Sequence, residues 1–130
     1  MGRRSAGRIF STKGFGRFAS HEGIRDDDLC EAIVHAEAGL IDADLGGGVI
    51  KQRIARRGRG KSGGFRTIVL FRRETMAVFV YGFAKSDRDN IRPDELKAFR
   101  TLAAAMLSLD DAALAAAMQN GTLREIECHG

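Results

Sequence analysis

The stretch VIKQRIARRGRGKSGGFRTIVLFRRETMAVFVYGFA, residues 49–84, decides the fold of this chain. It contains three runs rich in β-branched and aromatic residues, at residues 49–55, 65–71 and 76–84. Short polar stretches separate the runs, so we expect three neighbouring antiparallel strands in one sheet. The middle run is almost continuously apolar, which predicts a central strand.

Basic residues are concentrated around these strands. Residues 45–73 contain nine Lys and Arg and no acid, whereas the whole chain has 21 basic and 17 acidic residues. The net charge of +4 is therefore the sum of +9 in residues 45–73 and −5 in the rest of the chain (12 basic minus 17 acidic). Such a concentration of one sign favours a polyanionic partner, such as RNA, DNA or an acidic protein segment.

The alternation of side chains places the first basic residues of this segment. Within residues 49–55, Lys51 and Arg53 fall on one strand face, opposite Ile50, Gln52 and Ile54. Residues 57–64 contain four glycines and read as a flexible hairpin loop. This loop would present three further cations, which are Arg57, Arg59 and Lys61.

Four helices are expected outside the three strands. Ser11 or Thr12 can cap a helix that runs to about residue 20, and a second helix begins with three aspartates at residues 26–28. We interpret these aspartates as a first helical turn in preference to a metal site, because further converging acids are missing. Pro93 starts a third helix, and residues 110–119 form a fourth.

The resulting fold class is α+β, with a twisted antiparallel sheet of three to four strands. Residues 8–10 form a first strand, and the tail at residues 122–128 can add an edge strand. Two N-terminal helices and the C-terminal helices pack on this sheet. With 130 residues and 44% hydrophobic residues, we expect a single domain over residues 1–130, with residues 1–7 mobile and residues 110–130 as a C-terminal extension.

The same composition bears on location and redox state. No apolar run approaches the roughly 18 residues of a membrane span, and the N-terminus lacks the apolar core of a signal peptide. We therefore expect a cytoplasmic protein without a membrane partner. Cys30 and Cys128 lie far apart without CxxC spacing, so we expect free thiols in a reducing compartment.

Several kinds of catalytic site have little support. Glycines 46–48 and the GKS triplet suggest a phosphate-binding loop, but the spacing is wrong and a strand follows instead of a helix. None of the three histidines lies near a Gly-flanked nucleophile, so a catalytic triad is not indicated. Lys and Arg remain, and these residues can stabilise the charge on a pentavalent phosphorus intermediate. Arg53 disfavours the protonated form of Lys51, which makes Lys51 a candidate base.

Two motifs together resemble a known family. The segment at residues 51–66, which ends in GRGKSGGFR, and the segment FVYGFAKSDRDNI at residues 79–91 resemble the RelE/ParE superfamily of bacterial toxins, in its RelE/HigB-like branch. The resemblance extends over residues 8–109. It implies a small α+β fold, a DNA-binding antitoxin encoded beside the toxin, and cleavage of mRNA at the ribosomal A site by 2′-OH attack, without a metal or cofactor.

The resemblance also assigns roles to basic residues. Lys51 and Arg53 match the strand residues that contact the scissile phosphate, and Arg66 matches the arginine that stabilises the transition state. Lys85 matches a catalytic lysine of the second motif. Ser86 stands where a basic residue is expected, and the usual tyrosine is missing near Arg92. The general acid is thus unassigned, with Lys85, Arg56 or Lys61 as substitutes, and the expected phosphate contacts are Arg56, Arg57, Arg59, Lys61 and Arg88.

Two other functions stay open. A ParE-like inhibitor of DNA gyrase shares the fold but needs no convergence of cations on one phosphate. A non-catalytic RNA- or ribosome-binding module would agree with Ser86 and the missing tyrosine. The nuclease prediction requires that Lys51, Arg53, Arg66 and Lys85 meet on one face of the sheet.

Overall fold

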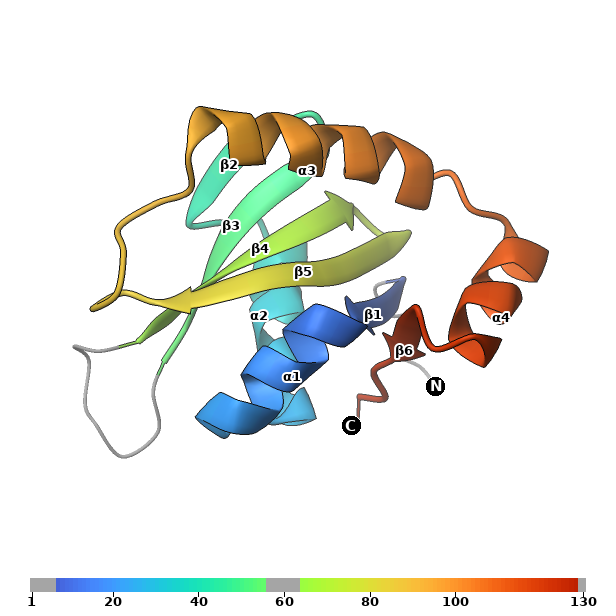
Figure 1. Cartoon of the computed structure of the whole chain (residues 1–130), viewed down its shortest axis with the longest axis horizontal. Helices are drawn as coiled ribbons and strands as arrows, with labels where there is room; N and C mark the ends of the chain where they lie inside the picture. Colours follow the sequence, from blue (N-terminus) through green and yellow to red (C-terminus); the bar gives the residue numbers. More distant parts are fainter. Residues whose placement is uncertain (1–6, 56–63, 129–130) are drawn as a thin grey trace.

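A computed structural model describes residues 7–55 and 64–128 of the chain (Figure 1). In chain order the elements are β1 (Arg8–Thr12), α1 (Lys13–Glu22), α2 (Asp26–Glu37), β2 (Ala43–Gly46), β3 (Val49–Ile54), β4 (Phe65–Arg72), β5 (Met76–Ala84), α3 (Pro93–Met106), α4 (Asp111–Gln119) and β6 (Leu123–Glu125). The predicted α+β class is confirmed. The order of the helices and of the three long strands is also as predicted.

The strands form one sheet in the order β2-β3-β4-β5-β1-β6. As predicted, β3, β4 and β5 are antiparallel neighbours, and the apolar β4 lies inside the sheet. The sheet has six described strands rather than three to four, and it is only mostly antiparallel. The reason is that β1 pairs with β5 in parallel, while β2 and β6 add antiparallel edges.

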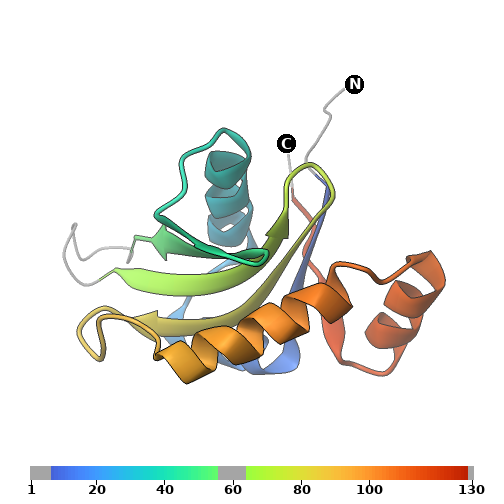
Figure 2. The same cartoon turned by 90° about the horizontal axis from the view of Figure 1, so that it is seen from above.

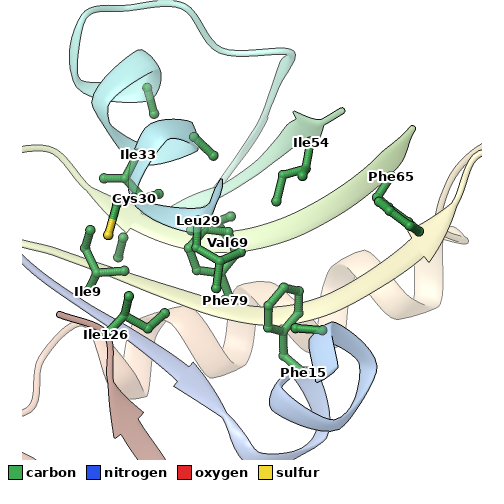
Figure 3. Packing of buried hydrophobic residues seen from close by; sticks show 14 of the residues in the cluster. Ile9, Phe15, Leu29, Cys30, Ile33, Ile54, Phe65, Val69, Phe79 and Ile126 are labelled. Carbon is green, nitrogen blue, oxygen red and sulfur yellow. The ribbon is translucent and has the colours of Figure 1, made fainter. Parts of the chain in front are cut away.

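Helices cover both faces of the sheet, so each face has its own apolar core (Figure 2). On one face, α1 and α2 bury a cluster that includes Phe15, Leu29 and Phe79 (Figure 3). On the other face, α3 and α4 cover Ile68, Leu70 and their neighbours. We call these the α2 face and the α3 face.

The helix ends follow the predicted signals. The Thr12 hydroxyl accepts a hydrogen bond from the Phe15 N–H at the start of α1, and the Asp110 carboxylate caps α4. The three aspartates form the first turn of α2, as predicted, where carboxylates oppose the positive end of the helix dipole. Pro93 is the first residue of α3, again as predicted.

A β-bulge in β5 controls which side chains reach the α3 face. Ile68 of β4 pairs with Tyr81, but the next residue, Val69, pairs with Phe79, so Val80 is an extra residue. One extra residue shifts every later side chain to the opposite face of a strand. Phe79 therefore lies in the α2-face core, whereas Tyr81 and Phe83 turn to the α3 face.

The expectation of free thiols is wrong. Cys30 of α2 and Cys128 of the C-terminal tail form a disulfide across a sequence separation of 98 residues. The tail reaches α2 because β6 pairs with β1 at the edge of the sheet and Ile126 enters the α2-face core. Spacing in the sequence carried no sign of this, since the two cysteines meet only through strand pairing.

Within residues 7–55 and 64–128, no single helix is long and apolar enough to cross a membrane. Helices α3 and α4 have the length and apolar composition of a membrane span only when they are counted together, and the angle between the two helices is 116°.

Candidate functional site

Three of the predicted catalytic residues lie on the α3 face. Arg53 of β3 pairs directly with Arg66 of β4, and residues that pair across antiparallel strands share a face. Lys51 is two residues from Arg53 and pairs with Ile68, which belongs to the α3-face core. The structure therefore brings Lys51, Arg53 and Arg66 to one surface, which we call the cationic face.

The three side chains differ in exposure. Arg53 is exposed and Lys51 is half-buried, but Arg66 is only 9% exposed. A buried charge needs a partner, and the Arg66 Nε lies 3.5 Å from Oδ2 of Asp42, a residue just before β2. Sequence reasoning missed Asp42, because the segment at residues 41–46 offered no strand signal and no motif.

Asp42 is held in place by Gln52, a buried polar residue of β3. The Asp42 N–H donates to Oε1 of Gln52 at 2.8 Å. The Gln52 amide nitrogen donates in turn to the carbonyl oxygens of Ala32, at 2.9 Å, and Leu40, at 3.2 Å. Gln52 is 3% exposed, so these bonds compensate for its burial and tie the connection after α2 to the strand that carries Lys51 and Arg53.

Arg88, a predicted phosphate contact, is already bound within the chain. Its Nη2 donates to the Glu95 carboxylate at 2.6 Å and its Nη1 to the Tyr81 hydroxyl at 3.0 Å. The hydrogen bond that Arg88 donates to Glu95 is the main cause that raises the pKa of Arg88, and the same bond lowers the pKa of Glu95. The guanidinium carbon lies 5.4 Å from the centre of the Phe83 ring, and Phe83 pairs with Arg66.

Lys85 stands just past the end of β5. Its N–H donates to the Gly64 carbonyl at 3.1 Å, which extends the β4–β5 ladder by one step beyond the pair Phe65 and Ala84. Because Phe65 pairs with Ala84, the exposed Lys85 is at the same end of the sheet as Arg66.

Tyr81, the only tyrosine, packs in the middle of the α3 face. Its ring centre is 5.9 Å from Phe83 and 6.0 Å from Phe99 of α3. The hydroxyl accepts the hydrogen bond from Arg88. A tyrosine that is packed and hydrogen-bonded in this way links α3 to the cationic face.

The remaining predicted residues cannot be placed. Arg56, Arg57, Arg59 and Lys61 all lie outside the described residues. Within the described part of the chain, no group of three or more His, Cys, Asp and Glu side chains is arranged to hold a metal ion.

Gly46 ends β2, Gly47 and Gly48 form the turn to β3, and all three have positive φ. The Arg100 side chain of α3 packs over Gly47 and donates to the Leu45 carbonyl. This run is therefore a turn that docks α3, not a phosphate loop.

A protein-family model described as "RelE toxin of RelE / RelB toxin-antitoxin system" matches residues 7–126. The match includes α4 and β6, which lie beyond the region of the sequence motifs. No curated protein matches the chain.

Proposed function

Because the chain belongs to the RelE family and is thus a toxin of a toxin-antitoxin system, we propose that it is a metal-independent endoribonuclease that cuts mRNA on the ribosome. The observation that carries this proposal is the shared face of Lys51, Arg53 and Arg66. Had Arg66 and Lys51 pointed to opposite faces of the sheet, they could not act on one phosphate. Placement in the RelE/HigB-like branch is part of the same proposal.

The reaction needs no group beyond this chain and its RNA substrate. Lys51 acts as the base that takes the proton of the substrate 2′-OH, and the 2′-oxygen then attacks the adjacent phosphorus. The bond from phosphorus to the 5′-oxygen breaks, which leaves a 2′,3′-cyclic phosphate and a 5′-hydroxyl. Arg53 contacts the scissile phosphate, and Lys85 protonates the leaving 5′-oxygen.

Arg66 stabilises the charge that builds on the phosphoryl oxygens. Its Nε is the nitrogen that lies beside Asp42, and the two terminal nitrogens carry the other four of the five guanidinium N–H donors. A planar guanidinium oriented at Nε is suited to bidentate contact with two oxygens. This geometry supports a role for Arg66 that lysine cannot replace.

The test is induced expression followed by mapping of mRNA 5′ ends. We expect cuts within translated codons, and we expect them to disappear in Arg66→Ala and to stay weak in Arg66→Lys. Arg73→Ala is the matched control, since Arg73 is an exposed arginine in the turn after β4. DNA damage with intact mRNA would indicate a gyrase inhibitor, and growth arrest without either change would indicate a non-catalytic binder.

Membership of the family also implies a cognate antitoxin as partner. We propose that this antitoxin is a DNA-binding protein encoded beside the toxin. Coexpression of the neighbouring reading frame should restore growth. Failure of both neighbouring frames to do so would contradict this part of the proposal.

A further inference from the structure

A groove of about 450 Å³ runs along α1, on the side of the sheet away from the cationic face. One wall is the flank of α1, and the other is formed by β6 and the turn that precedes it. The lining contains no carboxylate and no large apolar side chain. Its side chains are three cations and three hydroxyls, which are Lys13, Arg17, Arg124, Ser11, Thr12 and Ser20.

The cations converge from both walls. Lys13 and Arg17 are four residues apart on α1 and therefore lie on the same side of the helix. Both are exposed, and neither forms an ion pair with a described residue. Arg124 faces them from β6, where Asp26 accepts two hydrogen bonds from its guanidinium, at 2.9 and 3.2 Å. With that carboxylate counted, the groove keeps a net charge of +2 (three cations minus one acid).

Ser11 provides a second and independent indication of a ligand. It is 1% exposed, it lines the groove, and its Oγ has no hydrogen-bond partner. A buried hydroxyl without a partner is uncommon in a folded protein, because burial removes its bonds to water. An acceptor that enters the groove beside Gly16 would satisfy it, since a Cβ at residue 16 would lie only 3.8 Å from this oxygen.

The start of α1 adds backbone donors to the same place. Thr12 accepts the Phe15 N–H, so the N–H groups of Lys13 and Gly14 have no intrahelical acceptor. Free N–H groups and the positive end of a helix favour an anion. Cations, hydroxyls and helix donors together match the oxygens of a phosphate group.

We propose that this groove binds a phosphate group, either free phosphate or a phosphate of an RNA backbone. The inference does not depend on catalysis, because the sheet separates the groove from Lys51, Arg53 and Arg66. A chain that cuts no RNA would still bind phosphate here.

Titration of the full chain with inorganic phosphate at constant ionic strength, followed by amide NMR, tests the proposal. We expect saturable shifts at Ser11 and in the first turn of α1. Arg17→Gln should weaken binding about tenfold, in line with the loss of one charge-assisted hydrogen bond. The matched control is Lys97→Gln, a change at an exposed lysine of α3, which should leave the affinity unchanged.

A second variant separates the site from general charge. Gly16→Ala keeps every cation and places a methyl group in contact with Ser11, where nothing else lies within 4 Å. Alanine is also the better helix former, so the variant should melt no lower than the parent. We expect it to lose most of the phosphate affinity.

Short single-stranded RNA distinguishes the two sources of phosphate. If the backbone is the ligand, Gly16→Ala and Arg17→Gln weaken RNA binding as well as phosphate binding. If free phosphate is the ligand, only phosphate binding weakens. The proposal is overturned if phosphate gives no saturable shift in the groove and RNA affinity is the same in the parent and both variants. Cleavage of mRNA is scored separately, so this failure differs from failure of the nuclease proposal.

Discussion

Replacing Asp42 with asparagine tests whether this carboxylate positions Arg66. The Arg66 Nε lies 3.5 Å from the carboxylate, and the two side chains are 11% and 28% exposed. At an effective dielectric constant of about 20, opposite charges at that distance attract by about 5 kcal/mol. Desolvation and the partial exposure of Asp42 offset much of this energy, so we expect a net coupling of about 1–3 kcal/mol.

A double-mutant cycle isolates that coupling. Urea unfolding of the parent, Asp42→Asn, Arg66→Met and the double variant gives the interaction free energy, since each single change removes the same pair. Asparagine preserves the shape of the side chain and the bond from the Asp42 backbone to Gln52. The exposed pair Arg92 and Asp94 is the control and should show no measurable coupling.

The same variants link the pair to function. If Asp42 positions Arg66, Asp42→Asn should slow RNA cleavage while leaving RNA affinity nearly unchanged. Asp42→Glu should restore part of the rate. A coupling energy below about 0.5 kcal/mol, together with full cleavage by Asp42→Asn, would refute the reasoning, because distant, independent sites give values of that size.

Three further predictions concern stability. Reducing the bond between Cys30 and Cys128, which closes a loop of 98 residues, should lower the free energy of unfolding by up to about 4–5 kcal/mol in urea titrations, and Cys128→Ser should abolish the response to reductant. Gly82→Ala should lower the free energy of unfolding by about 1–3 kcal/mol in the same assay, because its Cβ would lie 2.3 Å from the ring of Phe18 in α1. The control is Gly14→Ala, whose Cβ would meet nothing within 4 Å and which should not destabilise the protein. Folding lowers the pKa of Glu95 below its unfolded value of 4.5, mainly because Glu95 accepts a hydrogen bond from Arg88. The contribution of Glu95 to the free energy of unfolding is therefore present above pH 4.5 and is lost as the pH falls through the folded pKa. Glu95→Gln should therefore flatten the acid limb of the stability curve, and an unchanged limb would contradict this assignment.

Local patterns were enough to predict much of the fold. Continuous apolar residues at 65–71 identified the inner strand, because a strand covered on both faces carries apolar side chains in both directions. Ser11 or Thr12, the three aspartates at residues 26–28 and Pro93 marked helix starts, because the unpaired N–H groups there favour such residues. Strand alternation placed Lys51 and Arg53 on one face.

Partners of the candidate site could not be predicted in the same way. Asp42 approaches Arg66 only because β2 pairs with β3 and because Gln52 accepts a hydrogen bond from the Asp42 N–H. The hydroxyl of Ser11 and the cations of α1 likewise meet Arg124 through the pairing of β1 with β6. These contacts join residues far apart in the chain, so no local pattern encodes them.

The sequence by itself therefore determined the three central strands, the four helices and the concentration of cations on β3 and β4. Only the tertiary structure decided which side chains from different elements share a surface. The bulge at Val80 turns Tyr81 and Phe83 onto the face of Arg66, which simple alternation from Phe79 would have placed on the opposite side. The physical reason is that successive side chains of a strand point to alternate faces. One extra residue in a strand therefore moves all the following side chains to the opposite face.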